Sequence, residues 1–273
     1  AHGIAVPGQT AIARAADISL LDESLRFPLV LKPSRSVAGQ DGKRIRAGVA
    51  YASNVQELRE RLRHMSVDAY PVLLQQRVDG PGLGMSVLVW GGVLFAAFAH
   101  RRIREKPPSG GVSVLRESIP IDQMLLTRSL ALLRDFKWKG VAMVEYKLDS
   151  HTGVPYLMEI NGRFWGSLQL AIDSGVDFPN LLVQLVLGAT PSPVIRYENG
   201  VRSRWEWGDM DHFLAMMLHP PAITTPSIRP KSHRFATIAE FVRGFSRGNR
   251  SEVFRSDDLG PFLRESVDWF RRR

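Results

Sequence analysis

The chain has 273 residues, of which 44% are hydrophobic and 23% charged, the composition of a globular protein with a substantial core. It contains no cysteine, which excludes disulfides, thiolate catalysis and zinc sites built on sulfur. The formal net charge of +9 favours anionic partners such as phosphates, nucleotides, nucleic acid or acidic lipid.

The chain shows no targeting or membrane signal. Its opening, AHGIAVPGQT, has neither the basic start nor the apolar block of a signal peptide, and no apolar run is long enough to cross a bilayer. We therefore expect a cytoplasmic protein without a membrane span and, because the sequence starts without Met, a fragment of a longer one. The basic residues fall in short clusters (LKPSRS, GKRIR, HRRIREK, RRR) rather than in a long basic helix, which disfavours nucleic acid as a partner.

The first part of the chain predicts a strand, a loop, a helix and a second strand. Residues 27–33 (FPLVLKP) are typical of a buried strand stopped by proline, and residues 34–48 of a polar loop with three glycines. Ser53 and Gln56 form a capping-box pattern that opens an amphipathic helix over residues 53–65. Residues 71–78 (PVLLQQRV) predict the second strand.

The middle of the chain predicts a β-hairpin over residues 84–103, turning at Gly91-Gly92, because both glycines accept a positive φ. Residues 105–113 (EKPPSGGVS) predict a loop. Asp122 and Asp177 are predicted to cap two helices, the second ended by Gly188. After residue 190 we expect a C-terminal helical extension whose tryptophans are packing anchors rather than ligands.

Residues 144–163 (VEYKLDSHTGVPYLMEINGR) predict a hairpin that holds two acids. With a three-residue loop at 151–153, Glu145 lies directly across from Glu159, with the two Cβ atoms about 5 Å apart. Asn161, two residues further along, projects from the same face. Two like charges placed so closely need a neutralising partner.

Two interpretations of this acid pair stay open. In the first, Lys147 helps to neutralise an exposed, solvated charge ladder. In the second, which we favour because Val141 and Met143 make the face partly apolar, the carboxylates and the Asn161 amide oxygen bind a divalent cation such as Mg2+, which takes hard oxygen ligands alongside water and phosphate. Arg163 would then meet phosphate oxygens beside the metal.

A second group of polar residues surrounds the 105–113 loop. His100 and Arg102 share one face of the strand before it, next to Arg101, and the backbone N–H groups of Ser109, Gly110 and Gly111 can face an anion. We predict a cradle for a substrate carboxylate or acyl phosphate here, the alternative being a basic strand end with an ordinary loop.

The E-x-N-x-R pattern at residues 159–163, with a second acid on the neighbouring strand, resembles the ATP-grasp superfamily. The segments FAHRRIREKPPSGGVSVLRES and EINGRFWGSLQLAIDSGVDFP are similar to a carboxylate–amine ligase-like branch, akin to the large subunit of carbamoyl-phosphate synthetase. The resemblance covers about residues 3–190. It implies an α+β ATP-grasp fold, in which two α+β lobes grip a nucleotide. The lobes are expected at residues 1–78 and 79–190 and the C-terminal extension at 191–273. The family's N-terminal domain is expected to be absent.

The resemblance also implies roles for individual residues. Glu145 and Glu159 would bind one Mg2+ ion, Glu159 and Asn161 a second, and Mn2+ could replace Mg2+. Lys32 would reach the α- or β-phosphate of ATP and, with Arg102 and Arg163, serve catalysis. The adenine would meet the remaining predicted nucleotide-binding residues: Gln75, Gln76, Arg77, Val78 and Met158.

Two positions depart from the family pattern. The loop after Lys32 has only Gly39, Gly42 and Gly48, widely spaced, and the acid that holds the ribose is missing near Leu83 and Gly84, with Asp79 as a substitute.

The implied function is an ATP-dependent ligase that joins a small carboxylate to an amine through an acyl phosphate. An ATP-grasp kinase, a catalytically silent nucleotide-binding module and a basic nucleic-acid binder are the alternatives. A homodimer is compatible with the resemblance.

Overall fold

The computed structural model describes residues 2–20, 25–33, 37–38, 45–46, 49–218, 230–246 and 248–272. Contacts divide the chain into a small unit, Ala5–Gly80 with Asp149–Leu157, and a large unit, Ala1–Ile4 with Pro81–Leu148 and Met158–Arg273. Residues after 190 group with the large unit, and the three-part division expected from the sequence stays a prediction. None of the described helices is long and apolar enough to cross a membrane.

The small unit is built on a four-stranded antiparallel sheet in the order β1-β6-β2-β5. Its strands are β1 (Gln9–Ile12), β2 (Leu29–Pro33), β5 (Ala50–Ala52) and β6 (Val72–Gln76), and its helices are α1 (Val55–His64) and the short 3-10 turns η1 (Ala15–Leu20) and η2 (Val67–Ala69). Leu58 and Leu62 of α1 are fully buried against Leu31 and Leu74 of the sheet. Burial of side chains of this size contributes about 2 kcal/mol each, so the predicted strands and helix form one core.

The start of α1 differs from the prediction by one residue. Asn54, not Ser53, is the N-cap: its side chain accepts the N–H of Glu57 at 2.9 Å. The carboxylate of Glu57 in turn accepts the N–H of Ser53 at 2.8 Å. The Ser53–Gln56 capping box was therefore wrong, because Asn54 satisfies the first-turn donors and Glu57, not Gln56, reaches back.

Most of the polar loop predicted after Lys32, including Gly39, Gly42 and Gly48, lies outside the described residues. Only β3 (Val37–Ala38) and β4 (Ile45–Arg46), which pair antiparallel, are described there.

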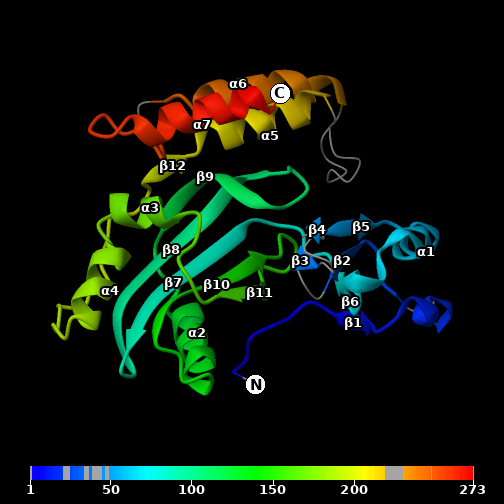
Figure 1. Cartoon of the computed structure of the whole chain (residues 1–273), viewed down its shortest axis with the longest axis horizontal. Coiled ribbons are helices and arrows are strands. Elements are labelled where there is room, and N and C mark those ends of the chain that lie inside the picture. Colours follow the sequence, from blue (N-terminus) through cyan, green and yellow to red (C-terminus); the bar gives the residue numbers. More distant parts are fainter. Residues whose placement is uncertain are drawn as a thin grey trace. The chain divides into compact units, whose positions relative to one another are not determined.

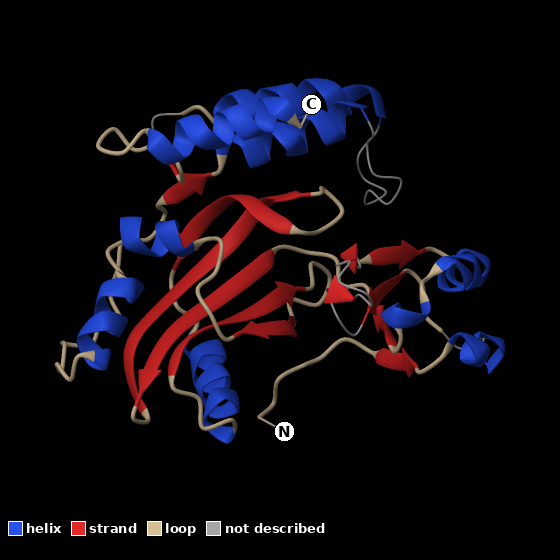
Figure 2. Ribbon diagram, viewed as in Figure 1, coloured by secondary structure: helices blue, strands red, loops and turns tan. Residues whose placement is uncertain are grey.

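The large unit contains a seven-stranded sheet in the order β11-β10-β7-β8-β9-β12-β13 (Figures 1 and 2). Its strands are β7 (Gly82–Trp90), β8 (Val93–Lys106), β9 (Val112–Ile119), β10 (Gly140–Leu148), β11 (Pro155–Asn161), β12 (Arg202–Arg204) and β13 (Asn249–Ser251). The β7–β8 hairpin turns at Gly91 and Gly92, with φ of 58° and 80°, as predicted. β8 extends to Lys106, so the predicted loop is shorter and occupies residues 107–111.

The loop between β10 and β11 has four residues, 150–153, instead of three. Asp149 N–H donates to Val154 O at 3.0 Å, and Gly153 N–H donates to Asp149 O at 2.8 Å. The predicted loop was one residue short because the Asp149 carboxylate accepts two further N–H groups, from His151 and Thr152 at 2.9 Å each, which closes the turn one position earlier. Gly153 has the predicted positive φ, 67°.

Three helices accompany the central strands: α2 (Gln123–Asp135), α3 (Leu168–Asp173) and α4 (Phe178–Val186). Asp122 caps α2 and Asp177 caps α4 through side-chain bonds to first-turn N–H groups, as predicted. α3 was not predicted. Residues from α3 and α4 pack with strand residues into one core that includes Leu88, Phe98, Met143, Trp165 and Phe178.

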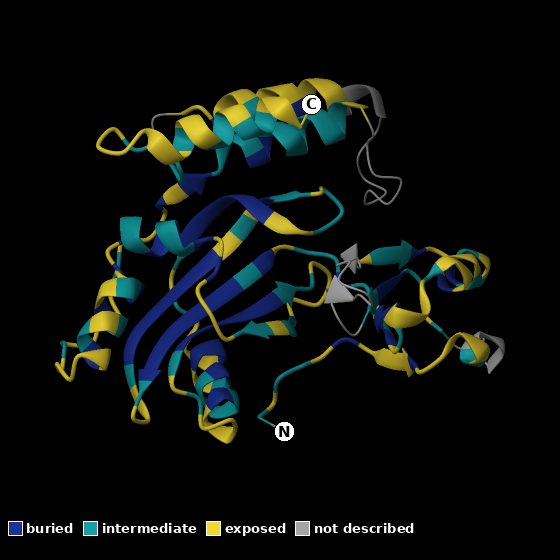
Figure 3. Cartoon of the chain, in the orientation of Figure 1, coloured by how far each residue is buried: buried dark blue, intermediate teal, exposed yellow. Residues whose placement is uncertain are grey.

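The C-terminal part contains the predicted helices α5 (Glu206–Leu218), α6 (Pro230–Arg243) and α7 (Gly260–Arg271), which lie together in Figure 1 with largely exposed outer faces in Figure 3. It is not purely helical, because β12 and β13 add two strands to the main sheet. These three-residue strands are too short to leave a periodic pattern. The indole N–H groups of Trp205, Trp207 and Trp269 donate to Glu265, Ser266 and Asp211, so these tryptophans anchor helix packing as expected.

Candidate functional site

A pocket of about 340 Å³ opens in the large unit on one face of the main sheet. Strands β8, β9, β10 and β11 and the segment after β11 supply its lining. These residues are His100, Arg102, Gly111, Val112, Ser113, Arg116, Met143, Glu145, Glu159, Asn161, Arg163, Trp165, Gly166 and Ser167. The structure thus brings together the predicted metal ligands, both large-unit arginines assigned to catalysis and part of the predicted substrate group.

Two glycines of β7, Gly82 and Gly84, make room for the side chains of His100 and Arg102 at this pocket. Gly84 pairs with Glu145 on one side and His100 on the other. A Cβ at Gly84 would lie 2.2 Å from His100 Cε1, and one at Gly82 would lie 2.7 Å from Arg102 Cδ. The missing side chains therefore let the imidazole and the guanidinium lie across the strand toward Glu145.

Glu145 and Glu159 come close to each other, with Asn161 between them, although the turn does not have the register that was predicted to place them directly opposite. The Asn161 amide donates to Glu145 at 3.0 Å and to Glu159 at 2.9 Å. Glu145 is only 9% exposed. Burial raises the pKa of Glu145 to about 7, Glu159 adds to the rise, and Arg102 opposes it. The solvated charge ladder does not describe Glu145, because that carboxylate is buried.

The donor set of this cluster fits magnesium. The described residues contain no group of three or more His, Cys, Asp or Glu side chains that could hold a metal ion. Mg2+, however, is commonly held by one or two carboxylates, with waters and substrate phosphates completing its octahedron. A buried carboxylate whose proton is favoured by a second acid is a position where a cation can replace that proton.

Arg102 connects the acid pair with the 107–111 loop. Its guanidinium bonds the Glu145 carboxylate and also donates to Glu105 at 3.3 Å and to Gly111 O at 3.2 Å. Arg102 therefore supplies the positive charge nearest to Glu145 in the structure.

The predicted anion cradle is only partly present. Gly110 N–H donates to Pro107 O at 3.1 Å, and Gly111 N–H donates to the Glu105 carboxylate at 3.3 Å, so both donors are used within the protein. Ser109 and Gly110 do not line the pocket. Arg101 points to the opposite face of β8, where it forms an ion pair with Glu117 at 2.6 Å.

The remaining predicted residues of the large unit lie at the end of β11. Arg163 lines the pocket, is exposed and donates to Phe164 O at 2.9 Å. Met158 is half-buried and does not line this pocket.

The small unit carries the other predicted nucleotide-binding residues on and beside its central strands. Lys32 pairs with Leu73 across β2 and β6. Gln75 is 4% exposed and donates to Gln9 at 3.2 Å, whereas Gln76 is exposed.

The backbone N–H of Arg77, directly after β6, already donates a hydrogen bond within the protein. This N–H donates to Pro28 O at 3.1 Å, so a base contact at Arg77 would use its carbonyl oxygen; buried Val78 follows. Asp79, the substitute for the ribose acid, forms an ion pair with Arg77 at 2.8 Å.

Comparison with known families decides the relationship. Residues 68–207, half of the chain, match the model of the family described as ATP-grasp in the biosynthetic pathway with Ter operon. The chain belongs to this ATP-grasp family. The resemblance seen in the sequence and the α+β fold expected from it are confirmed.

Solved structures share the ATP-grasp fold at low identity. The L-amino acid ligase of Bacillus licheniformis is 21% identical, with a TM-score of 0.50 over 68% of this chain and 44% of that one. N5-carboxyaminoimidazole synthetase of Staphylococcus aureus, solved with ADP, is 15% identical, with a TM-score of 0.53 over 74% and 51%. The biotin carboxylase domain of Hydrogenobacter thermophilus 2-oxoglutarate carboxylase, solved with MgADP, is 16% identical, with a TM-score of 0.55 over 74% and 46%.

The ATP-grasp chain spans about half the length of these structures. No curated protein sequence matches it.

Sequence reasoning missed several residues of the ATP-grasp pocket, above all Arg116. This arginine is 1% exposed, donates to Ser113 O at 2.9 Å and forms an ion pair with Glu252. Burial lowers the pKa of Arg116 to about 10, and Arg102 adds to the effect. The strand VSVLRESI mixes apolar, polar and charged residues, so its sequence carried no signal that singled out Arg116 as buried.

His100 is neutral in this pocket. It is 1% exposed, and its Nε2 lies 3.2 Å from Ser167 Oγ. Burial lowers the pKa of His100 to about 3, with Arg102 and Arg116 contributing. His100 therefore cannot bind an anion as an imidazolium near neutral pH.

The depressed pKa of His100 predicts a loss of stability in acid. The unfolded chain takes up this proton near pH 6.5, whereas the folded chain resists it to about pH 3. The contribution to stability is therefore present above pH 6.5 and is lost as the pH falls toward 3. Between pH 7 and pH 5, the free energy of unfolding of the wild type should fall by about 2 kcal/mol more than that of His100→Gln. Urea unfolding of both proteins at the two pH values measures this difference. His64→Gln, on the exposed end of α1, should behave like the wild type.

Proposed function

We propose that this chain carries the nucleotide-binding and catalytic residues of an ATP- and Mg2+-dependent ligase that activates a small carboxylate as an acyl phosphate and joins it to an amine. The observation that carries the proposal is the cluster of Glu145, Glu159 and Asn161 beside Arg102 in one pocket. Membership of the ATP-grasp family and the shared fold of ligases solved with ADP support it.

In this proposal, Glu145 and Glu159 hold one metal ion, and Glu159 and Asn161 hold a second. When bound, Mg2+, or Mn2+ in its place, neutralises the phosphate oxygens of ATP. Arg102 now pairs with Glu145. A cation at Glu145 would compete with that guanidinium and free it for the substrate, since both neutralise the same carboxylate.

The other residues bind and orient the substrates. Arg163 and Arg102 stabilise the charge of the transferring γ-phosphoryl group, and Arg102 also meets the substrate carboxylate beside His100. In the small unit, Lys32 binds the α- or β-phosphate, and Gln75, Gln76 and the backbone of Arg77 and Val78 bind the base. Met158 would contribute apolar contact to the same base.

The reaction proceeds in two steps. A substrate carboxylate oxygen attacks the γ-phosphorus, the bond to the ADP oxygen breaks, and an acyl phosphate forms. The amine nitrogen then attacks the acyl carbon, inorganic phosphate leaves with the bonding electrons, and the nitrogen loses a proton. No protein nucleophile is required, consistent with a chain without cysteine.

The test is Mg2+-dependent ADP release by the full-length protein against a panel of carboxylates and amines. A ligase should release ADP and phosphate only when a matching pair is present, and hydroxylamine should trap the acyl group as a hydroxamate. ADP release with a stable phosphorylated product and no hydroxamate would instead identify a kinase. If the protein binds nucleotide but releases no ADP with any combination of carboxylate and amine, it is a nucleotide-binding module without catalytic activity, and the proposal is contradicted.

A further inference from the structure

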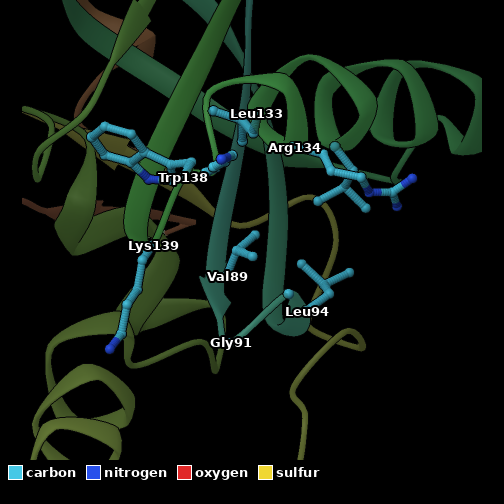
Figure 4. A pocket seen from close by; sticks show the side chains of 10 residues that line it. Val89, Gly91, Leu94, Leu133, Arg134, Trp138 and Lys139 are labelled. Carbon is cyan, nitrogen blue, oxygen red and sulfur yellow. The ribbon is translucent and has the colours of Figure 1, made fainter.

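A second pocket, of about 510 Å³, lies in the large unit beside the turn of the β7–β8 hairpin and the C-terminal end of α2. Figure 4 shows Val89 and Leu94 of the hairpin below Leu133 of α2, with Trp138 and Arg134 on opposite sides. None of its lining residues belongs to the ATP-grasp pocket described above. Its volume is within the range of small-molecule sites.

The lining of this second pocket is apolar inside and basic at the edge. Leucines, Val89 and Trp138 form the apolar surface, and the turn glycines Gly91 and Gly92 keep one side free of side chains. The charged lining residues are Arg134, Lys137 and Lys139, and the lining includes no acid. An occupant that satisfies both parts carries an apolar ring or branched chain and a negative charge.

The conformation of Lys137 is unusual. Its φ is +50°, in the left-handed region that glycine adopts most easily. Lys137 N–H donates to Arg134 O at 2.8 Å and Trp138 N–H donates to Leu133 O at 3.0 Å, the bonds that end a helix at a glycine. A basic residue near a helix C-terminus complements the dipole, but Arg134 already does so. Lys137 thus occupies the position at the helix end that glycine usually takes, and its side chain adds a positive charge to the pocket lining.

The same two hydrogen bonds remove an objection to an anion at this place. Free carbonyl oxygens at a helix C-terminus repel negative charge. Here the carbonyls of Leu133 and Arg134 each accept an N–H. Lys137 and Arg134 form no ion pair with any residue in the part of the chain that the structure describes. Lys139 lies over the Trp90 ring, 3.9 Å from its centroid.

Trp138 connects this pocket to the ATP-grasp site. A Cβ at Gly162 would lie 2.3 Å from Trp138 Cη2, so the indole packs directly on that glycine. Gly162 stands between Asn161 and Arg163. Because the indole lies directly against the backbone of Gly162, a displacement of Trp138 would press on the segment that carries Asn161 and Arg163.

We propose that the pocket between the β7–β8 turn and the end of α2 binds a small organic anion with an aromatic or branched apolar group, and that its occupancy is transmitted through Trp138 to the Asn161–Arg163 segment. Binding of an anion in this pocket does not depend on the ligase activity proposed above. An effect of that binding on catalysis does rest on the proposed ligase activity.

The binding test uses anilinonaphthalene sulfonate, a fluorescent aromatic anion, with the full-length protein. Lys137→Gly should raise its dissociation constant about three- to tenfold at low salt, since one rim charge is removed. Glycine suits the positive φ, so this variant should fold at least as stably as the wild type. Leu94→Trp, which places a larger side chain in the pocket lining, should weaken binding more than tenfold. Arg63→Gln, which removes an exposed charge on α1, should change nothing.

Uncharged N-phenylnaphthylamine separates charge recognition from apolar binding. Lys137→Gly should leave its affinity unchanged, whereas Leu94→Trp should weaken it. If sulfonate binding survives both substitutions, the dye lies elsewhere and the proposed site is overturned.

Hydrogen exchange tests the connection without requiring activity. Saturating sulfonate dye should change amide exchange over residues 159–165 in the wild type, and the change should be lost in Trp138→Leu. Unchanged exchange in the wild type would overturn the coupling. Dye binding and hydrogen exchange are both measured without nucleotide. Both tests therefore remain valid even if the protein never releases ADP.

Discussion

Replacing Glu159 with Gln is expected to abolish Mg2+-dependent ADP release, with kcat/KM lowered by at least about 100-fold. Glutamine keeps the size of the side chain and removes the charge that pairs with a cation. Because Glu159 raises the pKa of Glu145, removing it relieves the repulsion between the two acids. The variant without metal should therefore be as stable as the wild type, or more stable, near neutral pH. Steady-state kinetics and urea unfolding on the same preparations measure both effects.

The matched control for Glu159→Gln is Glu60→Gln, which removes an exposed glutamate from α1. It should leave ADP release unchanged. Turnover by Glu159→Gln close to that of the wild type, in folded protein, would show that Glu159 is a structural residue and would contradict the metal site.

Replacing Asp209 with Ala is expected to destabilise the large unit by about 3–5 kcal/mol, because it leaves buried charge uncompensated. Asp209 is fully buried on α5 and accepts from Arg104 of β8 at 2.9 Å and from Arg204 of β12 at 2.7 Å. Burial lowers the pKa of Arg104, and Asp209 opposes that shift, so the carboxylate compensates the charge of this guanidinium in the interior. Thermal and urea unfolding of the variant would measure the loss.

Asp268→Ala is the control for this ion-pair deletion. Asp268 pairs with the exposed Arg264 on α7 at 3.2 Å. A surface pair of this kind contributes less than about 1 kcal/mol. If the two substitutions lower the free energy of unfolding equally, the buried ion pair does not stabilise the fold. If Asp209→Ala loses only the C-terminal helices while the sheet unfolds as in the wild type, α5 is an appendage rather than part of the fold. Either result would contradict the prediction.

Asp209 also shows where the sequence was least informative. The segment DMDHFLAMML predicts a helix, and the helix is present, but nothing in it indicates that the first acid joins two arginines from strands about 100 and 5 residues away. The two short strands of the C-terminal part were missed for a related reason. Their pairing with β9 and with each other depends on partners distant in sequence, whereas sequence patterns report local periodicity.

The candidate site was more predictable because much of it lies on one hairpin. The Asn161 amide donates to both Glu145 and Glu159, so the three predicted side chains meet in one site. The longer loop changes the register by one residue at the turn, and simple alternation from the turn therefore does not account for their meeting. The substrate group was less predictable. Alternation separated Arg101 from His100 and Arg102, but the N–H groups of the glycine loop went to Pro107 and Glu105 instead of a ligand.

The sequence by itself determined the long strands of the β7–β8 hairpin, the helices capped by Asp122 and Asp177, the family pattern and the identity of the paired acids, since each follows from spacing along a continuous segment. Only the tertiary structure decided which charges are buried and with whom: Arg102 with Glu145, Arg116 with Glu252, and Asp209 with its two arginines. The physical reason is that desolvation and pairing of a charge depend on everything packed around it, which β-sheet register and helix packing bring from distant parts of the chain.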